Sequence, residues 1–249
     1  MVVKNQIKFI KSLQQKKYRN ESGLFVAEGI NTVRELLASE FKAEKVYVTD
    51  PEALNVASRA FTPITQKELQ QMSGLASPNT VLGVFHIPKP KKIDFSDWVL
   101  ALDDVRDPGN LGTIIRLCDW FGIRHLVCSL NTVDCYNPKV LQATMGSIAR
   151  VNIGYTDLQD FCRRAEVPIY GAFMEGEPVY GLDIPKTGIL VMGNEAKGVS
   201  KEVEVLIAQK VGIPPFGAGK AESLNVAMAT SILLHEIRRP LSGQPLTQK

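Results

Sequence analysis

Hydrophobic positions in the second half of the chain fall into short, almost continuous apolar runs. Such runs are typical of strands buried on both faces, and they predict strands at 98–102, 125–128, 150–153, 169–173, 188–192 and 210–213. Between the runs, apolar residues recur with helical spacing, which predicts helices at 111–121, 138–148, 158–165, 201–208 and 224–237. Strands that alternate with helices form a mostly parallel sheet covered on both sides, so the predicted fold class is α/β.

The N-terminal part of the chain shows the same alternation on a smaller scale. Its apolar pattern predicts strands at 24–27, 45–48 and 81–86 and helices at 4–14, 30–38, 52–60 and 66–72. The stretch 87–93, rich in proline and lysine, cannot pack as a regular element and is interpreted as a linker. We therefore predict two domains, residues 1–92 and residues 93–249.

The composition is ordinary for a globular protein, and it argues against several classes of protein. Of the 249 residues, 45% are apolar and 22% charged. No apolar run reaches the roughly 18 residues needed to span a membrane, and the N-terminus does not resemble an export signal. The four cysteines lack metal-binding spacing, so we expect reduced, mostly buried thiols, no metal site and a cytoplasmic location.

Charge is distributed unevenly along the chain. The net charge is +3, but residues 1–92 carry +6 and residues 93–249 carry −3. The first 19 residues contain six basic side chains and no acidic one, namely Lys4, Lys8, Lys11, Lys16, Lys17 and Arg19. This asymmetry favours a polyanionic partner such as nucleic acid, although a solvated helix face explains the charges equally well.

Two loops that follow predicted strands carry polar groups next to glycine. Ligands of parallel sheets bind beyond the carboxyl ends of the strands, where these loops lie. In the first loop, Asn110 is positioned to cap the following helix, and Arg116 lies among apolar residues of that helix. In the second, Glu195 comes two residues after Gly193, and Ser200 can cap the next helix. The alternative is that these residues are ordinary caps and surface charges.

The third loop runs from Ile213 into the last predicted helix. Ser223 is expected to be the N-cap of that helix, and the amide of Asn225, a poor helix former, is expected to serve binding. The glycines of the first loop do not fit the G-x-G-x-x-G fingerprint, which disfavours a nicotinamide-dependent oxidoreductase.

Taken together, the loops resemble the three signature motifs of the SpoU (TrmH-like) RNA ribose methyltransferases of the SPOUT superfamily. Asn110 and Arg116 match the first motif, and Gly193–Asn194–Glu195 with Gly198 matches the second. Ile213–Pro214 together with Ser223–Leu224–Asn225–Val226 matches the third. The resemblance covers about residues 97–239. Near the N-terminus, Lys16–Lys17–Tyr18–Arg19 and residues 23–29 resemble the family's substrate-binding domain. The chain departs from the pattern at Ala196 and in a longer stretch at 215–222.

The resemblance implies a fold, a cofactor and a partner. The C-terminal domain would contain a trefoil knot and the N-terminal domain would be an α/β sandwich. S-Adenosyl-L-methionine would be held by Met192, Gly193, Ile213, Pro214 and Leu224. Members are homodimers that methylate ribose 2′-hydroxyls of RNA. The implied catalytic residues are Asn110, Arg116, Glu195, Ser223 and Asn225.

The N-terminal domain implies ribosomal RNA rather than transfer RNA as the substrate, with Lys16, Lys17 and Arg19 as contacts. The alternatives that stay open are a transfer-RNA ribose methyltransferase and a non-catalytic RNA-binding protein of the same fold.

Overall fold

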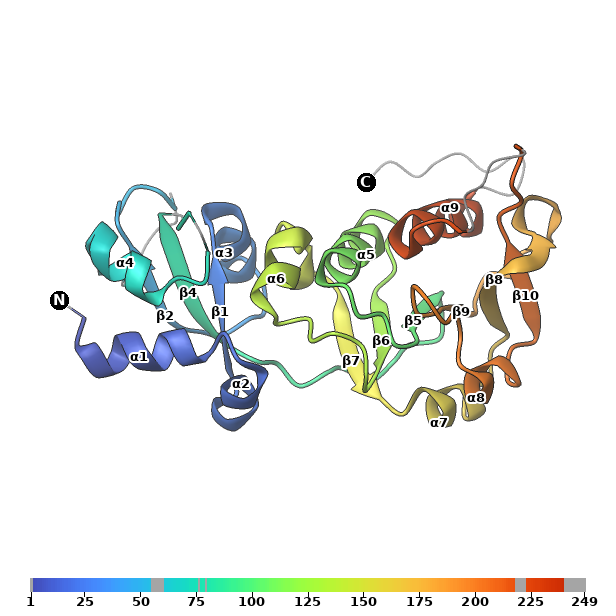
Figure 1. Ribbon diagram of the computed structural model, residues 1–249, viewed down its shortest axis with the longest axis horizontal. Coiled ribbons are helices and arrows are strands. Elements are labelled where there is room, and N and C mark those ends of the chain that lie inside the picture. The colour runs from blue at the N-terminus through green and yellow to red at the C-terminus, as the bar shows by residue number, and fades with distance from the viewer. Residues whose placement is uncertain (1, 55–60, 76, 79, 218–222, 240–249) are drawn as a thin grey trace. The chain divides into compact units, whose positions relative to one another are not determined.

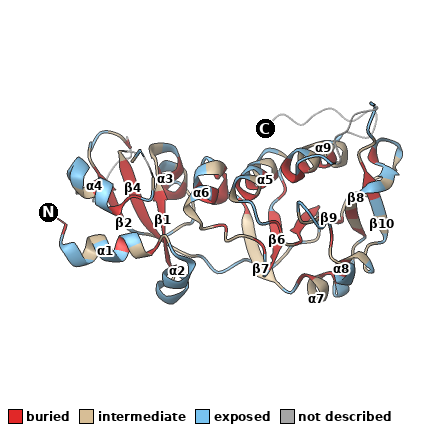
Figure 2. Ribbon diagram, in the orientation of Figure 1, coloured by how far each residue is buried: buried red, intermediate tan, exposed pale blue. Residues whose placement is uncertain are grey.

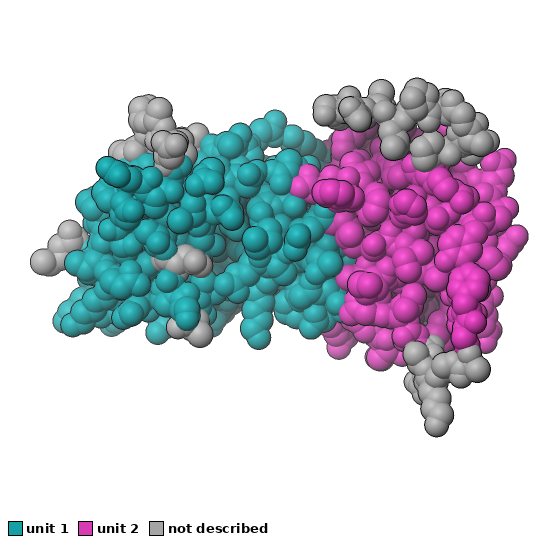
Figure 3. Space-filling view, turned by 90° about the horizontal axis from the view of Figure 1, so that it is seen from above, with its two compact units in different colours: residues 1–91, 107–116, 133–152 teal, residues 92–106, 117–132, 153–249 magenta. Residues whose placement is uncertain are grey.

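The computed structural model describes residues 2–54, 61–75, 77–78, 80–217 and 223–239. The chain divides into two compact units (Figure 3). Unit 1 comprises residues 1–91, 107–116 and 133–152, and unit 2 comprises residues 92–106, 117–132 and 153–249. Unit 1 therefore contains two segments from the second half of the chain as well as the N-terminal part.

Unit 1 is built on a four-stranded mixed sheet (Figure 1). Its strands, in spatial order, are β1 (Leu24–Glu28), β4 (Val81–His86), β2 (Ala43–Val48) and β3 (Thr62–Pro63). Strand β4 pairs antiparallel with both β1 and β2, and the short β3 pairs parallel with β2. The three longer strands lie close to their predicted positions.

Helices cover both faces of this sheet. They are α1 (Lys4–Ser12), α2 (Lys16–Ser22), α3 (Ile30–Leu37), α4 (Gln66–Met72), α6 (Pro138–Thr144) and the 3₁₀ turn η1 (Ser147–Ala149). Leu24 and Val26 pack with residues of α1 and α4 on one face. Phe25 points to the other face, where it stacks near Phe85 and lies 4.5 Å, between ring centroids, from Tyr136. This alternation makes the N-terminal part an α/β sandwich.

The basic residues of helix α2 differ in how far they are exposed. Lys16 and Lys17 are exposed, as RNA contacts must be. Arg19, by contrast, is only 2% exposed, and its guanidinium pairs with the carboxylate of Asp134. Its Nη1 donates to the backbone carbonyls of Leu13, at 2.9 Å, and Gln14, at 2.8 Å. The prediction that Arg19 contacts RNA is therefore corrected, because its donors are used inside the protein.

Unit 2 is built on a six-stranded sheet in the order β10–β8–β9–β5–β6–β7 (Figure 1). The strands are β5 (Val99–Leu102), β6 (His125–Ser129), β7 (Asn152–Thr156), β8 (Ile169–Pro178), β9 (Ile189–Met192) and β10 (Gln209–Gly212). The pairings from β10 through β8, β9 and β5 to β6 are all parallel. Strands β5, β6 and β9 are buried along their whole length, as their apolar runs predict (Figure 2).

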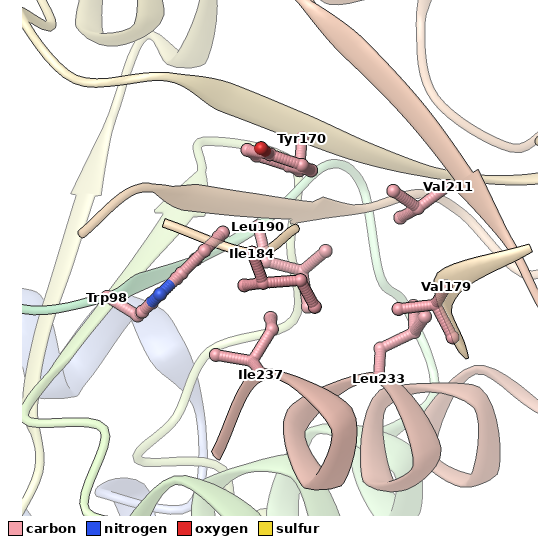
Figure 4. A pocket seen from close by; sticks show the side chains of 8 residues that line it. All are labelled: Trp98, Tyr170, Val179, Ile184, Leu190, Val211, Leu233 and Ile237. Atoms are coloured by element: carbon pink, nitrogen blue, oxygen red, sulfur yellow. The ribbon is translucent and has the colours of Figure 1, made fainter. Parts of the chain in front are cut away.

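The central strands of this sheet bury side chains on both faces. The helical elements after β7 are α7 (Leu158–Arg163), η2 (Val179–Gly181), α8 (Lys201–Glu204) and α9 (Val226–Arg238). Ile189 and Val191 of β9 join a core cluster with residues of α7 and α8. Leu190 points the other way, toward Leu233 of α9 (Figure 4). The predicted doubly covered sheet is present.

Several expected element boundaries differ from those observed. Helix α5 (Pro108–Trp120) begins three residues before the predicted start, and α6 and α8 are shorter than predicted. Of the helix expected at 52–60, residues 55–60 lie outside the described residues. Among the described residues, the elements that the pattern did not predict are α2, β3 and the 3₁₀ turn η2. All four cysteines are free and buried.

Candidate active site

The candidate site is built where neighbouring parallel strands end. Leu102, the last residue of β5, pairs with Met192, the last residue of β9. The loops that follow these two strands therefore start side by side at one edge of the sheet. Met192 itself is buried, so any contact of this residue with a cofactor would be made through the backbone.

Gly193 begins a tight turn that admits no side chain. Asn194 and Gly198 form a two-residue bridge in which each N–H donates to the other's carbonyl oxygen at 2.9 Å. A Cβ atom on Gly193 would lie 2.2 Å from the carbonyl carbon of Gly198 and 2.3 Å from the nitrogen of Val199. Gly198 has a φ of +69°, a conformation that glycine adopts without strain. Backbone therefore packs on backbone at this point.

Replacing Gly193 by alanine is expected to open this turn. The atoms that a Cβ would meet belong to the backbone, so they cannot move without breaking the bridge between Asn194 and Gly198. We expect the free energy of unfolding to fall by about 1–3 kcal/mol and the affinity for S-adenosylmethionine to fall at least tenfold. Urea unfolding and calorimetry would measure the two effects. The matched control is Gly181→Ala, since a Cβ there meets no atom within 4 Å.

Two buried polar contacts tie the second loop to the first. Asp103 is only 6% exposed, and its Oδ2 accepts hydrogen bonds from the backbone nitrogen of Ser200, at 2.8 Å, and from its hydroxyl, at 2.6 Å. Ser200 is the N-cap residue of α8, but its side chain makes no cap hydrogen bond. The prediction that the Ser200 hydroxyl caps α8 is wrong, because Asp103 binds that hydroxyl instead.

Asn194 makes the second connection between the two loops. Its Nδ2 donates to the carbonyl oxygen of Asp104 at 2.6 Å, and its Oδ1 accepts from the nitrogens of Ala196 and Lys197. The backbone nitrogen of Asp104 in turn donates to the hydroxyl of Ser129, at the end of β6, at 2.8 Å. The loops that follow three strands are thus held together by one hydrogen-bond network. The sequence pattern marked Asn194 only as part of the second motif and did not mark Asp103, Asp104 or Ser129, although each of the four lies at a strand end or within two residues of one.

Glu195 is an exposed carboxylate anchored to the first loop. Its Oε2 accepts a hydrogen bond from the backbone nitrogen of Arg106 at 3.3 Å. The Arg106 side chain, 64% exposed, donates from Nε to Oδ1 of Asp104 at 2.8 Å. The structure therefore brings the second-motif glutamate next to the loop that leads into α5.

Helix α5 carries the two predicted residues of the first motif. Its first turn is capped by Asp107, whose Oδ1 accepts from the nitrogen of Asn110 at 2.8 Å. Asn110 is therefore inside the helix and does not cap it, because the helix begins at Pro108. Arg116 is exposed and does not lie among the core residues of α5, which corrects that expectation.

The start of α9 also differs from the prediction. Its N-cap is Asn225, whose Oδ1 accepts from the nitrogens of Ala227, at 2.9 Å, and Met228, at 3.3 Å. Ser223 precedes the helix as an exposed residue and is not its cap. The unexpected asparagine is thus explained in part by capping, which Asn performs as well as Ser.

Removing the Asn225 side chain should therefore weaken α9, whereas removing the Ser223 hydroxyl should not. Loss of an N-cap costs about 1 kcal/mol, so we expect Asn225→Ala to lower the free energy of unfolding by this amount. Asn225→Asp keeps a side-chain acceptor, so its free energy of unfolding should be close to that of the unmodified protein. Urea unfolding is the measurement. A stability loss in Ser223→Ala that equals the loss in Asn225→Ala would contradict the cap assignment.

The third loop starts at the carboxyl end of β10. Ile213 and Pro214 are half-buried, and Leu224, just before α9, is 51% exposed. Phe216 is 91% exposed. Residues 218–222, which include most of the stretch where the chain departs from the family pattern, lie outside the described residues.

A small cavity in unit 2 is separate from this edge of the sheet. It has a volume of about 10 Å³ and is lined by the apolar or aromatic residues Trp98, Tyr170, Val179, Ile184, Leu190, Val211, Leu233 and Ile237 (Figure 4). Its space suffices for about one water molecule, and it lies within the core beneath α9. It is a packing gap and not a cofactor site.

The described residues show neither a metal-binding cluster nor a membrane-spanning element. No group of three or more His, Cys, Asp or Glu residues among them could hold a metal ion. In the same residues, no helix has the length and apolar character required to cross a membrane.

Comparison with known proteins decides the family. A model of the SpoU rRNA methylase family matches residues 97–235, which is more than half of the chain. The chain belongs to the SpoU rRNA methylase family. A second model, of the MRM3-like substrate-binding domain, matches residues 4–83. The resemblance stated from the motifs is confirmed over both parts of the chain.

Relatives of this SpoU family member match along almost the whole chain. A 23S rRNA (guanosine(2553)-2′-O)-methyltransferase of Bacillus subtilis, RlmP, is 31% identical over 244 residues, which cover 94% of this chain and 97% of the relative. The structure of a TrmH-family protein from Porphyromonas gingivalis has a TM-score of 0.89 at 36% identity and covers 96% of this chain and 99% of its own.

An AdoMet-bound rRNA methyltransferase from Sinorhizobium meliloti has a TM-score of 0.84 at 31% identity and covers 96% of this chain and 97% of its own. These full-length matches confirm the predicted α/β fold class with a separate N-terminal domain.

Proposed function

We propose that this SpoU family member transfers a methyl group from S-adenosylmethionine to a ribose 2′-hydroxyl of ribosomal RNA. The observation that carries the proposal is the full-length likeness to the AdoMet-bound rRNA methyltransferase. The five residues by which the sequence resembles the family's three motifs agree with it. The site geometry supports it, because the loops that would bind a ligand are locked together by Asp103 and Asn194.

The residues at the sheet edge fit the proposed cofactor. Ile213, Pro214 and Leu224 leave apolar surface uncovered in the loop that follows β10, and the turn at Gly193 brings backbone polar groups to the end of β9. Apolar side chains next to backbone polar groups suit an adenine ring, which has apolar faces and a polar edge. We assign Met192, Gly193, Ile213, Pro214 and Leu224 to the cofactor site. When bound, S-adenosylmethionine supplies a methyl group attached to a positively charged sulfur.

Arg116 is assigned the central role toward the ribose. The 2′-hydroxyl is a weak nucleophile and must lose its proton as the new oxygen–carbon bond forms. Arginine stays protonated and cannot accept that proton, but it stabilises the developing alkoxide and holds the neighbouring phosphate. We assign the proton to that phosphate of the substrate. The exposed guanidinium on α5 is accessible to RNA, as this role requires.

The other motif residues are assigned positioning roles. Asn110, Glu195, Ser223 and Asn225 would orient Arg116 and the ribose by hydrogen bonds, which supplies rate by alignment. Asn110 and Arg116 belong to unit 1, whereas the other three belong to unit 2. Their convergence around one ribose is part of the proposal.

RNA would also contact the N-terminal domain. The exposed Lys16 and Lys17 of α2 are proposed to bind phosphates, while Arg19 is not. Phosphate contacts make affinity depend steeply on salt, so a Lys16→Ala/Lys17→Ala double variant should show a shallower salt dependence.

The remaining architecture follows the family. We propose a domain boundary at residues 92 and 93, a trefoil knot in the C-terminal domain, and an isologous homodimer with the site near its interface. With ribosomal RNA as its substrate, the protein would act in the cytoplasm.

Two measurements test this function. Calorimetry should detect binding of S-adenosylmethionine and none of NAD; binding of NAD alone would overturn the proposal. Mapping of ribose-methylated positions in RNA from a deletion strain should reveal a ribosomal position that loses its methyl group. A lost methyl group in transfer RNA would favour the transfer-RNA alternative, and no loss in any RNA would favour a non-catalytic RNA-binding protein.

A further inference from the structure

Arg106 differs from other arginines of unit 2 in how its guanidinium is held. Arg124, Arg163 and Arg238 direct terminal nitrogens, Nη1 or Nη2, at carboxylates of the protein. Arg106 instead uses Nε, which donates to Asp104. Within the described part of the chain, its two terminal nitrogens have no hydrogen-bond acceptor. Nη1 and Nη2 are therefore available as a pair on a side chain that is 64% exposed.

The backbone under Arg106 is shaped to hold it in place. Asp104 has a φ of +59°, which few residues other than glycine adopt, although aspartate does so more readily than most. The nitrogen and carbonyl oxygen of Asp104 are bound by Ser129 and Asn194. The nitrogen of Arg106 is bound by Glu195. A strained residue fixed from several sides is typical of functional loops.

We propose that Arg106 binds a phosphate of the substrate RNA beside the ribose that is methylated. The proposal rests on the proposed function and extends it to a residue outside the family motifs. A guanidinium with both terminal nitrogens free presents two parallel donors, which match two oxygens of a phosphate. Its place is the loop between β5 and α5, bonded to the motif residue Glu195.

The neighbouring carboxylates strengthen this assignment. Asp104 and Glu195 would repel RNA phosphates, and Arg106 is the cation that lies against both of them. The hydrogen bond that Arg106 donates to Asp104, together with the negative charges of Asp104 and Glu195, raises the pKa of Arg106, so the guanidinium stays charged. Removing Arg106 therefore deletes an attractive contact and also leaves two repulsive charges facing the substrate.

The test compares Arg106→Ala with a matched control, Arg124→Ala. Arg124 is 60% exposed and pairs with Asp94 at 3.0 Å, but it precedes β6 and so lies at the amino end of that strand. The probe is deproteinised ribosomal RNA from a strain lacking the gene. Filter binding from about 50 to 200 mM salt gives the affinity, and methyl transfer gives KM and kcat.

We expect Arg106→Ala to weaken RNA binding about tenfold at the lowest salt and to reduce the salt slope by roughly 0.7 to 0.9. KM for RNA should rise, while kcat at saturating RNA and the affinity for S-adenosylmethionine stay within about twofold. Arg106→Lys keeps the charge without the paired donors and should restore the slope but only part of the affinity. Asp104→Asn should raise KM less than Arg106→Ala does.

Equal RNA binding by Arg106→Ala and Arg124→Ala would overturn the inference. The inference would also be overturned if Arg106→Ala lost both affinity for S-adenosylmethionine and stability, because Arg106 would then only hold the loop in place. A wild-type protein that fails to methylate ribosomal RNA would refute the proposed function instead. In that case the two salt slopes would still decide whether Arg106 contacts phosphate.

Discussion

Replacing Arg116 by alanine is expected to lower methyl transfer to ribosomal RNA about a hundred- to a thousandfold, the usual loss when a donor to a developing oxyanion is removed. The affinity for S-adenosylmethionine should stay within about twofold, because the proposed cofactor contacts come from other loops. Stability should also be unchanged, since Arg116 is exposed on α5. Single-turnover transfer of a labelled methyl group separates the chemical step from binding.

Two further variants sharpen this experiment. Arg116→Lys keeps the positive charge but loses the planar pair of donors, so we expect it to recover only part of the rate. Arg163→Ala removes another exposed helical arginine, which pairs with its helical neighbour Asp160, and should leave the rate unchanged. Wild-type turnover by Arg116→Ala would remove the arginine from the mechanism. A loss of S-adenosylmethionine affinity as large as the loss of rate would place Arg116 in the cofactor site.

The apolar pattern predicted most of the sheet because buried strands must be apolar in any fold that contains them. Strands β5, β6 and β9 lie within one residue of their predicted positions. The short β3 went unpredicted, since two residues carry no periodic signal. Helix α2 went unpredicted because its polar sequence, Lys16–Ser22, has no apolar face to read.

The site was predictable in its residue types but not in its contacts. Ser223 and Asn225 are both good cap residues two positions apart, and only the path of the chain decides that Asn225 takes the role. Likewise Ser200 binds Asp103, 97 residues earlier, in place of its own helix. Contacts over such separations leave no local pattern, so the network that holds the loops was not found from the sequence.

A contact between residues far apart in the sequence also explains why Arg19 is buried, and its loss should have a large effect on stability. Arg19 sits in a run of basic residues that favours a solvated or RNA-binding role, yet its partner Asp134 is 115 residues away. We expect Arg19→Ala to lower the free energy of unfolding by about 3–5 kcal/mol, because it leaves a poorly exposed carboxylate without its cation. The carbonyls of Leu13 and Gln14 would lose their donor as well.

A double-mutant cycle isolates the pair. If the cost arises from the uncompensated charge, Asp134→Ala added to Arg19→Ala should cost much less than the sum of the two single losses. Arg34→Ala, on an exposed position of α3, is the control and should change stability by less than about 0.5 kcal/mol. Additive losses in the cycle would show that the two side chains act separately.

The RNA affinity of the same variant distinguishes the structural role from the one first predicted. Measured at a temperature where the variant remains folded, Arg19→Ala should bind ribosomal RNA within about twofold of wild type. The Lys16→Ala/Lys17→Ala variant should show the opposite behaviour, with normal stability and weaker binding, because both lysines are exposed. A loss of RNA affinity in folded Arg19→Ala would mean that the buried pair also sets the position of the neighbouring lysines on α2.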